Sequence, residues 1–534
     1  MASSRHVTLV RPPVVVNAMT MNQGPGSPPL SLACLSAVLK RSGYRVTAID
    51  AFGESTTRLT QIEQWPFYGC GLTTEEIIAR IPADTCLIGV SCMFSNEWLC
   101  HKRVINAIAE RFPGIPIIVG GEHATAAPDY VLRSCPGVLA CVLGEGEDTL
   151  LDLLDAIESG RSLDTVAGLL YRPASGADFV RTGPRARIRK LDELPWPDWD
   201  EIPLDKYLAS GVGMGVVHGR NMPMLASRGC PYKCTFCSNP QMWGKLWNVR
   251  SVEDVVAEMK HYKQKYDVDS FSFYDLTAIV RRDWVVEFVR LLNEERMNIR
   301  WYMPIGTRSE ALTPEIVAQL RASGCITLVF APESGSEITL QRIQKKVDLE
   351  KMVTSLRACR REGVFSKVHV IVGFPGETWT EILKSMRFIV RLAWVGVNDV
   401  AVYAFVPYPG SVFYEELKTT KGFPAEGDPF DLFLAYSCNN NYAGVCSWDE
   451  NLTDLQLRLL CMGASLMFYM IEFLLRPWRL GATCYRLVTG RPITLLERMI
   501  ATLARRNVHI LLSKLRLTGL HTRWKTPRER LNTR

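Results

Sequence analysis

The chain has 534 residues, of which 47% are hydrophobic and 22% charged, a composition typical of a globular protein with about three domains. Its 16 cysteines are scattered through apolar runs, which argues against a disulfide framework and favours a reducing cytoplasm. The first residues lack the long apolar core of a signal peptide. Residues 476–534 hold 14 Lys and Arg against two acids, a net charge of +12; the whole chain carries +7, which leaves −5 for the other residues.

Residues 1–160 alternate apolar β-rich runs with helical periods, the pattern of an α/β, doubly wound, Rossmann-like parallel sheet. We expect helices at about 28–42, 97–112 and 126–134, with another after the last strand. The predicted strands are VTLV from Val7, RVTAID from Arg45, CLIGVS from Cys86, IPIIVGG from Ile115 and VLACVLG from Val138. Ligands of such sheets bind beyond the carboxyl ends of the strands, so the residues there are candidates for a site.

Glycine-rich segments follow the fourth and fifth of these strands. They are GGEHAT, which begins at Gly120 and Gly121, and GEGE, which contains Glu145. Glycine lets the backbone approach a bulky ligand, because no side chain obstructs it. Each segment alone is also consistent with an ordinary strand-to-helix turn. Ser91 ends the third strand at the same edge of the predicted sheet.

Residues 161–214 are interpreted as a linker region, because the polar, Pro-rich run LDELPWPDWD at 191–200 breaks the periodicity. From about 215 to 425 the alternation of strands and helices resumes. Six strands are expected there, starting at Pro223, Ser270, Ile299, Ile326, Lys367 and Asp399. Six such units form a partial (β/α)6 TIM barrel, whose active site lies at the carboxyl ends of the strands.

The loop after the first barrel strand carries Cys230, Cys234 and Cys237 in the spacing C-x3-C-x2-C. Three thiolates bind three irons of a cubane cluster and leave the fourth iron open for another ligand. Structural zinc usually needs four ligands in two spaced pairs, and this segment offers neither a second pair nor a nearby histidine. We therefore predict that these cysteines bind a 4Fe-4S cluster.

Polar residues also follow later barrel strands. Asp275 follows the second strand and is a candidate acceptor for an ammonium or ribose hydroxyl. Arg308 follows the third strand and is a candidate clamp for a carboxylate, because guanidinium recognises carboxylate bidentately. A helix N-cap is the simpler interpretation of a lone acid at a strand end.

The cysteine spacing, with Phe236 directly before the last cysteine, resembles the radical S-adenosylmethionine (radical SAM) superfamily. The segments ESGS at 333–336 and GFPG at 373–376 are similar to motifs of that family and occur in the same order. The resemblance implies that SAM chelates the open iron and is cleaved to a 5′-deoxyadenosyl radical. It also implies that Phe236 packs beside the cluster and adenine, that Glu333 and Ser334 hold SAM, and that Gly373 and Pro375 line the adenine.

Ahead of these motifs, the glycine-rich strand ends of residues 1–160 resemble the cobalamin-binding domain of cobalamin-dependent radical SAM enzymes. The resemblance implies that Ser91, Gly120, Gly121 and Glu145 contact cobalamin. The D-x-H-x-x-G signature that supplies an axial histidine is absent, since DAFG at 50–53 contains no histidine. His123 is the nearest candidate, although a loop histidine is more often a hydrogen-bonding residue than a ligand. We expect cobalamin to bind without a protein imidazole.

The combined resemblance implies a C-methyltransferase, in which one SAM methylates cobalamin and a second yields the radical that activates a substrate carbon. The expected substrate is a small or hydrophobic metabolite of a natural product, lipid or tetrapyrrole pathway, and a reductase, flavodoxin or ferredoxin is the expected electron donor. An oxidative cyclase that uses the same cofactors is the alternative. A regulatory module that binds nucleic acid is disfavoured, because no helix-turn-helix is evident. No catalytic residue is assigned, since radical abstraction needs position and water exclusion rather than a tuned base.

Residues 426–534 are expected to form a helical, basic C-terminal domain beyond the reach of the resemblance. The helix expected from Leu455 to Leu475 is nearly all apolar, but it contains Glu472 and is marginal in length for a membrane span. A buried core helix or substrate cap is the favoured interpretation. The basic and aromatic cluster RPWR at 476–479 is of the kind found at membrane interfaces. Peripheral membrane contact of a cytoplasmic protein and a plain solvated basic face both stay open.

Overall fold

A computed structural model of the chain describes residues 5–17, 26–63, 65, 67–176, 178–215, 217–277, 279–307, 311–421, 426–437, 444–501 and 503–504. The chain divides into two compact units. The first comprises Met1–Ala18, Pro25–Ser270 and Pro407–Ala435, and the second comprises Met19–Gly24, Phe271–Val406 and Tyr436–Arg534. These units do not coincide with the ranges 1–160, 161–214, 215–425 and 426–534, which stay predictions.

The first unit is built on a seven-stranded sheet with the strand order β10-β9-β8-β7-β6-β1-β3. Its central strands pair in parallel, while β9 and β10 extend the edge in antiparallel fashion. The strand order reverses direction at β1, which creates the switch point at which such sheets bind ligands. The strands are β1 (His6–Arg11), β3 (Arg45–Asp50), β6 (Leu87–Ser91), β7 (Ile117–Gly120), β8 (Val138–Val142), β9 (Leu169–Tyr171) and β10 (Val180–Arg181).

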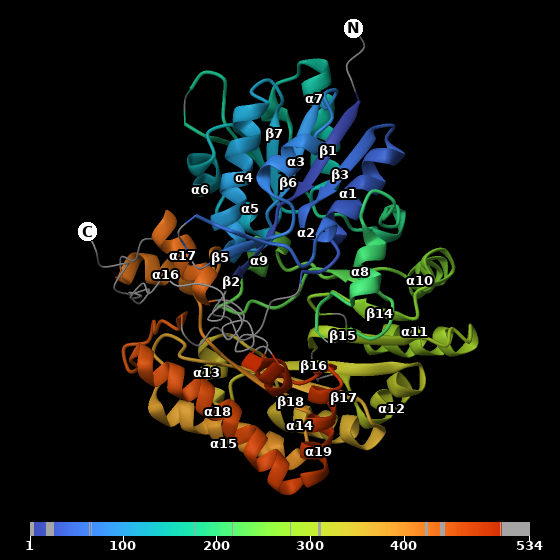
Figure 1. The fold of residues 1–534 in the computed structure, drawn as a ribbon, viewed down its shortest axis with the longest axis vertical. Coiled ribbons are helices and arrows are strands. Elements are labelled where there is room, and N and C mark those ends of the chain that lie inside the picture. Colours follow the sequence, from blue (N-terminus) through green and yellow to red (C-terminus); the bar gives the residue numbers. More distant parts are fainter. Residues whose placement is uncertain are drawn as a thin grey trace, which may run out of the picture. The chain divides into compact units, whose positions relative to one another are not determined.

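Helices cover both faces of this sheet (Figure 1). The helices α3 (Thr74–Arg80), α4 (Trp98–Arg111) and α6 (Pro128–Ser134) share one apolar cluster with the strands, while α1 (Leu30–Arg41) and α7 (Glu147–Ser159) pack elsewhere on the sheet. The doubly wound fold predicted from the sequence is confirmed. The helix predicted at 126–134 is α6, which begins at Pro128, and a separate short helix, α5 (Glu122–Ala126), precedes it.

The predicted linker at 161–214 belongs to the first unit. It supplies β9, β10 and the helix α8 (Leu204–Ser210). The hydroxyl of Tyr207 on α8 donates to Asp50 at the end of β3, and Arg11 at the end of β1 donates to the same hydroxyl at 2.9 Å. The ends of β1 and β3 are therefore occupied by this buried network.

Shorter elements complete the first unit. A small antiparallel sheet that the sequence pattern did not indicate is formed by β2 (Val14–Asn17), β5 (Phe67–Cys70) and β4 (Leu59–Gln61). The helix α2 (Ala51–Glu54) and the 3-10 turns at Ser95–Glu97, Leu163–Thr165 and Leu191–Glu193 lie in connections. The remaining elements are β11 (Asn221–Met224), β12 (Ser227–Arg228), β13 (Asn248–Val249), α9 (Asn239–Trp243), α10 (Val252–Tyr266), α16 (Val412–Lys421) and α17 (Asp428–Ser437).

The second unit contains nearly all of β14 to β18 and the helices α11 to α15 of the predicted partial barrel, whereas β11 and α10 belong to the first unit. The sheet has the order β11-β14-β15-β16-β17-β18, and β15 to β18 pair in parallel. The six strands in this order confirm the predicted (β/α)6 arrangement. The elements are β14 (Ser270–Phe273), α11 (Arg282–Glu294), β15 (Arg300–Thr307), α12 (Pro314–Ala322), β16 (Cys325–Glu333), α13 (Glu337–Arg342), α14 (Leu349–Glu362), β17 (Phe365–Val372), α15 (Trp379–Val395) and β18 (Asp399–Ala404).

The helices α18 (Asp454–Leu475) and α19 (Pro477–Val488) follow the barrel in the second unit. One side of α18 packs against α15 and β18 through buried residues such as Leu457 and Phe468. By length and composition alone, α18 is suited to cross a membrane, although core helices pass the same test and 39% of its most apolar window is buried. The helix is therefore buried on its packed side only, and the interpretation as a buried core helix or substrate cap stays a prediction.

Candidate functional site

The cysteine loop begins at β12 and is shaped by Gly229. This glycine has φ +87°, and a Cβ at this position would collide with the carbonyl oxygen of Leu246. Cys230, Cys234 and Cys237 are half-buried, and the amide of Cys237 donates to the carbonyl of Cys234 at 3.1 Å. A compact turn of this kind holds the three thiols on one short stretch of backbone.

The three thiols of the cysteine loop influence one another electrostatically. Burial raises the pKa of the Cys237 thiol to about 12, and negative charge on Glu122, Cys234 and Cys230 adds to the rise, so the three sulfurs are electrostatic neighbours. Within the described ranges, no three His, Cys, Asp or Glu side chains converge on one metal ion. A cubane cluster needs thiolates at separate corners, and a C-x3-C-x2-C loop supplies three of them.

A buried ion-pair network ties the cysteine loop to the fifth parallel strand of the first unit. Arg228, two residues before the first cysteine, reaches Glu147 at 2.6 Å and Glu145 at 3.2 Å. Glu145 also accepts from Arg187 at 2.6 Å and from the amide of Ile188 at 2.9 Å. All three charged side chains of the Arg228 pairs are at least 89% buried, so the network holds the loop in place with little competition from water.

Replacement of Arg228 by Met is expected to lower the free energy of unfolding by about 3 kcal/mol, because two buried carboxylates lose a partner. Thermal denaturation of the two proteins measures this loss. Arg290→Met is the matched control, since Arg290 also pairs two glutamates, Glu287 and Glu294, but is 51% exposed. The control should cost less than about 1 kcal/mol. An equal effect of both changes would contradict the assigned role of the network.

A second link joins the residues after the cysteines to the glycine-rich segment at 120–125. The hydroxyl of Ser238 donates to the carboxylate of Glu122, and Thr125 contacts the sulfur of Met242 at 3.4 Å. The helix α9 therefore packs on α5, and the carbonyl oxygen of Met242 lies 3.6 Å from where a Cβ on Gly144 would be. The cysteine loop and the glycine-rich strand ends thus share one wall in the first unit.

The structure brings Ser91, Gly120 and Gly121 together at one edge of the sheet. Ser91 pairs with Gly120 in the register of β6 and β7. Gly121 has φ +111°, and a Cβ there would lie 2.6 Å from the carbonyl oxygen of Cys92. Only glycine fits this conformation, because other residues meet their own carbonyl and that of the neighbouring strand end.

His123 is buried below this edge rather than exposed on a loop. Its Nδ1 hydrogen-bonds Ser95 at 2.9 Å, and its ring lies 4.8 Å from that of Trp98. Desolvation lowers the pKa of His123 to about 3, so the ring is neutral at physiological pH. Its Nε2 has no hydrogen-bond partner in the part of the chain that the structure describes. These contacts agree with the expected hydrogen-bonding role.

In the second unit, Glu333 is the last residue of β16 and has φ +71°, a strained conformation for a non-glycine residue. Its carboxylate pairs with Lys345 at 2.9 Å. The hydroxyl of Ser334 is hydrogen-bonded to that of Ser385 at 2.9 Å, which fixes the turn into α13. Backbone strain at a strand end is common at binding sites, and the role of Glu333 in holding SAM stays a prediction.

The adjacent strand β17 ends at Gly373, with φ +85°. The carboxylate of Glu377 accepts from the amides of Gly373 at 2.8 Å and Phe374 at 3.3 Å, and Thr339 donates to it at 3.4 Å. Glu377 therefore shapes the loop that contains Gly373 and Pro375 and joins it to α13. Glu333 pairs with Val370 of β17, so both loops lie at the same edge of the sheet.

Burial raises the pKa of Glu377 from 4.5 to about 7, against the opposing effect of its two amide donors. Because the pKa of Glu377 is higher in the folded state, the protonated carboxyl group stabilises the folded protein at low pH. This contribution of about 3 kcal/mol is lost as the pH rises from about 4.5 through about 7. Glu377→Gln should remove this dependence, because a neutral amide oxygen still accepts from both amides. Denaturation at about pH 5 and pH 8 compares the two proteins, and an identical pH dependence would contradict the assignment.

The other predicted residues have simpler placements. Asp275 is buried two residues after β14, while Phe236 and Pro375 are half-buried. Arg308 lies outside the described residues. Sequence reasoning missed Arg228, Glu147, Glu377 and Lys345 as positioning residues. Their only signal in the sequence is that they lie near a motif. Each of them acts either through a side chain from another segment or through the backbone amides of its own loop.

Comparison with known proteins decides the family. Residues 19–154 match the B12 binding domain, and residues 224–389 match the Radical SAM superfamily. The chain belongs to the cobalamin-dependent radical SAM enzymes. The two matches confirm the predicted cofactors, which are a 4Fe-4S cluster, SAM and cobalamin. The three cysteines on one loop and the glycines at the ends of β7 and β8 fit these groups.

Two curated proteins and one solved structure are similar to this chain. An uncharacterized methyltransferase of Pyrococcus horikoshii is 29% identical over 411 residues, 77% of this chain and 82% of its own length. An anaerobic magnesium-protoporphyrin IX monomethyl ester cyclase of Rubrivivax gelatinosus is 25% identical over 395 residues, 73% of this chain and 66% of its own. The radical SAM methyltransferase TsrM of Kitasatospora setae, solved with cobalamin and a 4Fe-4S cluster, aligns with TM-score 0.60 at 19% identity, over 79% of this chain and 76% of its own, which shows a shared fold.

Proposed function

We propose that this cobalamin-dependent radical SAM enzyme is a C-methyltransferase that adds a methyl group to an unactivated carbon of a small or hydrophobic metabolite. The observation that carries the proposal is the shared wall in the first unit. The segment predicted to bind the cluster continues into α9, and α9 packs on α5 at the glycine-rich edge predicted for cobalamin. Methyl transfer to a carbon radical requires the sites of radical formation and methyl donation to be near each other.

When bound, the cluster, SAM and cobalamin supply a 5′-deoxyadenosyl radical and a methyl donor. The side chains of the protein hold the predicted cofactor-binding segments in place. Arg228 with Glu145 and Glu147 holds the cysteine loop, and Ser238 with Glu122 holds the start of α9. A flavodoxin, ferredoxin or dedicated reductase supplies the electrons in this proposal.

An oxidative cyclase is the second candidate, and the similarity to the magnesium-protoporphyrin cyclase of Rubrivivax gelatinosus supports it. The two reactions differ in products. Methylation adds one methylene unit to the substrate and yields S-adenosylhomocysteine together with 5′-deoxyadenosine, whereas cyclisation removes hydrogen and yields no S-adenosylhomocysteine.

The test uses the anaerobically reconstituted enzyme with a chemical reductant, SAM labelled in its methyl group, and separate pools of lipids, tetrapyrroles and other metabolites. Mass spectrometry should find a labelled product in one pool and both SAM-derived products. Formation of 5′-deoxyadenosine that depends on a pool, with loss of hydrogen and no label in the product, would select the cyclase.

A further inference from the structure

One side of the helix α18 is exposed and consists of apolar residues along its whole length. We call this side the apolar face. Its members recur every three or four positions along the whole helix, and the only other exposed residues of α18 are Gln456 and Gly463. No charged residue of α18 is exposed, and Leu474 is 80% accessible. Soluble proteins rarely expose an apolar patch of this length without a partner. The face consists of Leu455, Leu459, Met462, Leu466, Met470 and Leu474.

The opposite side of α18 shows that the helix does not span a bilayer in this fold. That side is buried against α15 and β18, and it contains Glu472. The carboxylate of Glu472 pairs with Arg476 at 2.8 Å and also with Arg479, which in turn donates to the carbonyl of Val397 at 3.0 Å. Removing this side from the protein would break these contacts. A helix with one packed side and one apolar side is suited to lie along a surface.

Aromatic residues border the apolar face at both ends. The helix α15 packs beside α18 in the second unit (Figure 1). Exposed Trp379 begins α15 close to the start of α18, where Asn451 donates to the carbonyl of Glu377 at 3.2 Å. Exposed Trp394 lies near the end of α18, where Arg476 donates to its carbonyl at 2.9 Å, and Trp478 follows on α19 at 67% exposure. Tryptophan is the residue typical of membrane interfaces.

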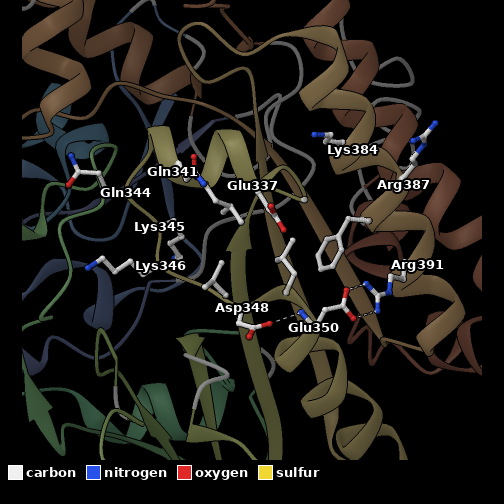
Figure 2. A pocket seen from close by; sticks show the side chains of 15 residues that line it. Glu337, Gln341, Gln344, Lys345, Lys346, Asp348, Glu350, Lys384, Arg387 and Arg391 are labelled. Atoms are coloured by element: carbon white, nitrogen blue, oxygen red, sulfur yellow. Dashed lines mark hydrogen bonds and ion pairs between the residues drawn. The ribbon is translucent and has the colours of Figure 1, made fainter.

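A basic groove lies along α14 and α15. One cavity of about 560 Å³ is lined by Arg357, Arg360, Arg361, Arg391, Trp394 and Val395. Arg391 also lines a second cavity of about 970 Å³, which Figure 2 shows with Lys345, Lys346, Lys384 and Arg387 around it. Together the two cavities hold eight Lys and Arg against three acids, although Glu350 is paired with Arg391 and Lys345 is paired with Glu333. We call the seven cations other than Lys345 the basic groove.

We propose that the apolar face and the basic groove dock the enzyme onto the surface of an anionic phospholipid bilayer, with α18 lying in the plane of the interface. The apolar face enters the boundary between headgroups and acyl chains, the tryptophans lie at headgroup level, and the basic groove faces the phosphates. A second copy of this protein does not suit the same surface, because its own basic groove would repel this one.

Flotation of the full-length reconstituted enzyme with lipid vesicles tests the proposal. We expect at least about tenfold more bound protein with vesicles that contain roughly a third phosphatidylglycerol than with pure phosphatidylcholine. The double change Leu459→Lys and Leu466→Lys should reduce binding at least about tenfold, because it places charge in the interface. Leu59→Lys is the matched control, since Leu59 is an exposed leucine on β4 of the first unit and should leave binding unchanged. Equal flotation of the double variant and wild type would overturn the proposal.

The basic groove has its own variant. Arg357→Gln with Arg361→Gln should weaken binding to anionic vesicles severalfold and flatten its dependence on salt, while binding to neutral vesicles stays the same. Thermal denaturation checks that each variant is folded. An unchanged salt dependence would remove the groove from the proposal and overturn its electrostatic part.

Oxidation of Met462 and Met470 by peroxide tests whether protein, rather than lipid, covers the apolar face. Both methionines are exposed, so we expect rapid oxidation without lipid and slow oxidation with anionic vesicles. Slow oxidation in the lipid-free enzyme would show that residues 505–534 or a second copy already cover the face, which would overturn the proposal. Sedimentation of the wild type and the double lysine variant would then separate these two cases.

Discussion

Cys234→Ala is expected to abolish iron–sulfur absorbance and to reduce SAM cleavage at least about 100-fold, while cobalamin stays bound. Cys234 is the middle ligand of the triplet, and its removal leaves two thiolates for a cluster that needs three from the protein. The strand edge predicted for cobalamin lies about 110 residues earlier in the sequence and depends on Gly121 and its neighbours rather than on this thiol. Iron and cobalt analysis, absorbance and the yield of 5′-deoxyadenosine measure the outcome.

Cys484→Ala is the matched control for this experiment, because Cys484 is an exposed cysteine on α19 outside any predicted site. It should leave iron, cobalt and SAM cleavage at wild-type levels. Retained SAM cleavage in Cys234→Ala would refute the ligand role of the triplet. Loss of cobalt together with iron would show that cobalamin binding depends on an assembled cluster.

Gly121→Val is expected to lower cobalt content by more than half and to destabilise the protein, while the cluster remains. The valine would be forced into a φ of +111°, and its Cβ would meet the carbonyl oxygen of Cys92 at 2.6 Å. A disallowed backbone conformation costs about 1–3 kcal/mol before any clash is counted. The ends of β6 and β7 must therefore separate, which alters the edge formed by Ser91 and Gly120.

Gly114→Val serves as the control in the same unit. A Cβ on Gly114 meets no atom within 4 Å, and its backbone is not in the left-handed region. Cobalt content and thermal denaturation of this variant should match the wild type within a few tenths of a kcal/mol. Unchanged cobalt in Gly121→Val would count against the placement of cobalamin at this edge.

The predicted strands and most predicted helices agree with the structure because their signals are local. Continuous apolar runs such as those of β1 and β6 are typical of parallel strands buried on both faces, and periodic segments such as α4 show one apolar side. The small sheet of β2, β4 and β5 has no such signal, since β4 is three exposed residues. The region 161–214 is interpreted as a linker because a Pro-rich run breaks its periodicity. Its contacts with the sheet, such as that of Tyr207 with Asp50, join residues distant in sequence and leave no local signal.

The helix α18 shows a different limit of sequence reasoning. An almost wholly apolar segment predicts burial, and the hydropathy alone does not tell which side meets the protein. The structure separates a packed side that carries Glu472 from an outward side whose exposed residues are uncharged. That separation turns a core helix into a candidate lipid-binding surface.

The sequence by itself determined the chemistry of the chain, because three cysteines within eight residues, the ESGS and GFPG segments and the glycine-rich strand ends are local patterns that the cofactors require. Only the tertiary structure decided how these parts are held. Arg228 meets Glu145 and Glu147 across more than 80 residues of sequence, and Glu377 receives the amides of its loop only after the backbone has turned. Such contacts depend on which segments the two sheets bring side by side, and no local pattern encodes that arrangement.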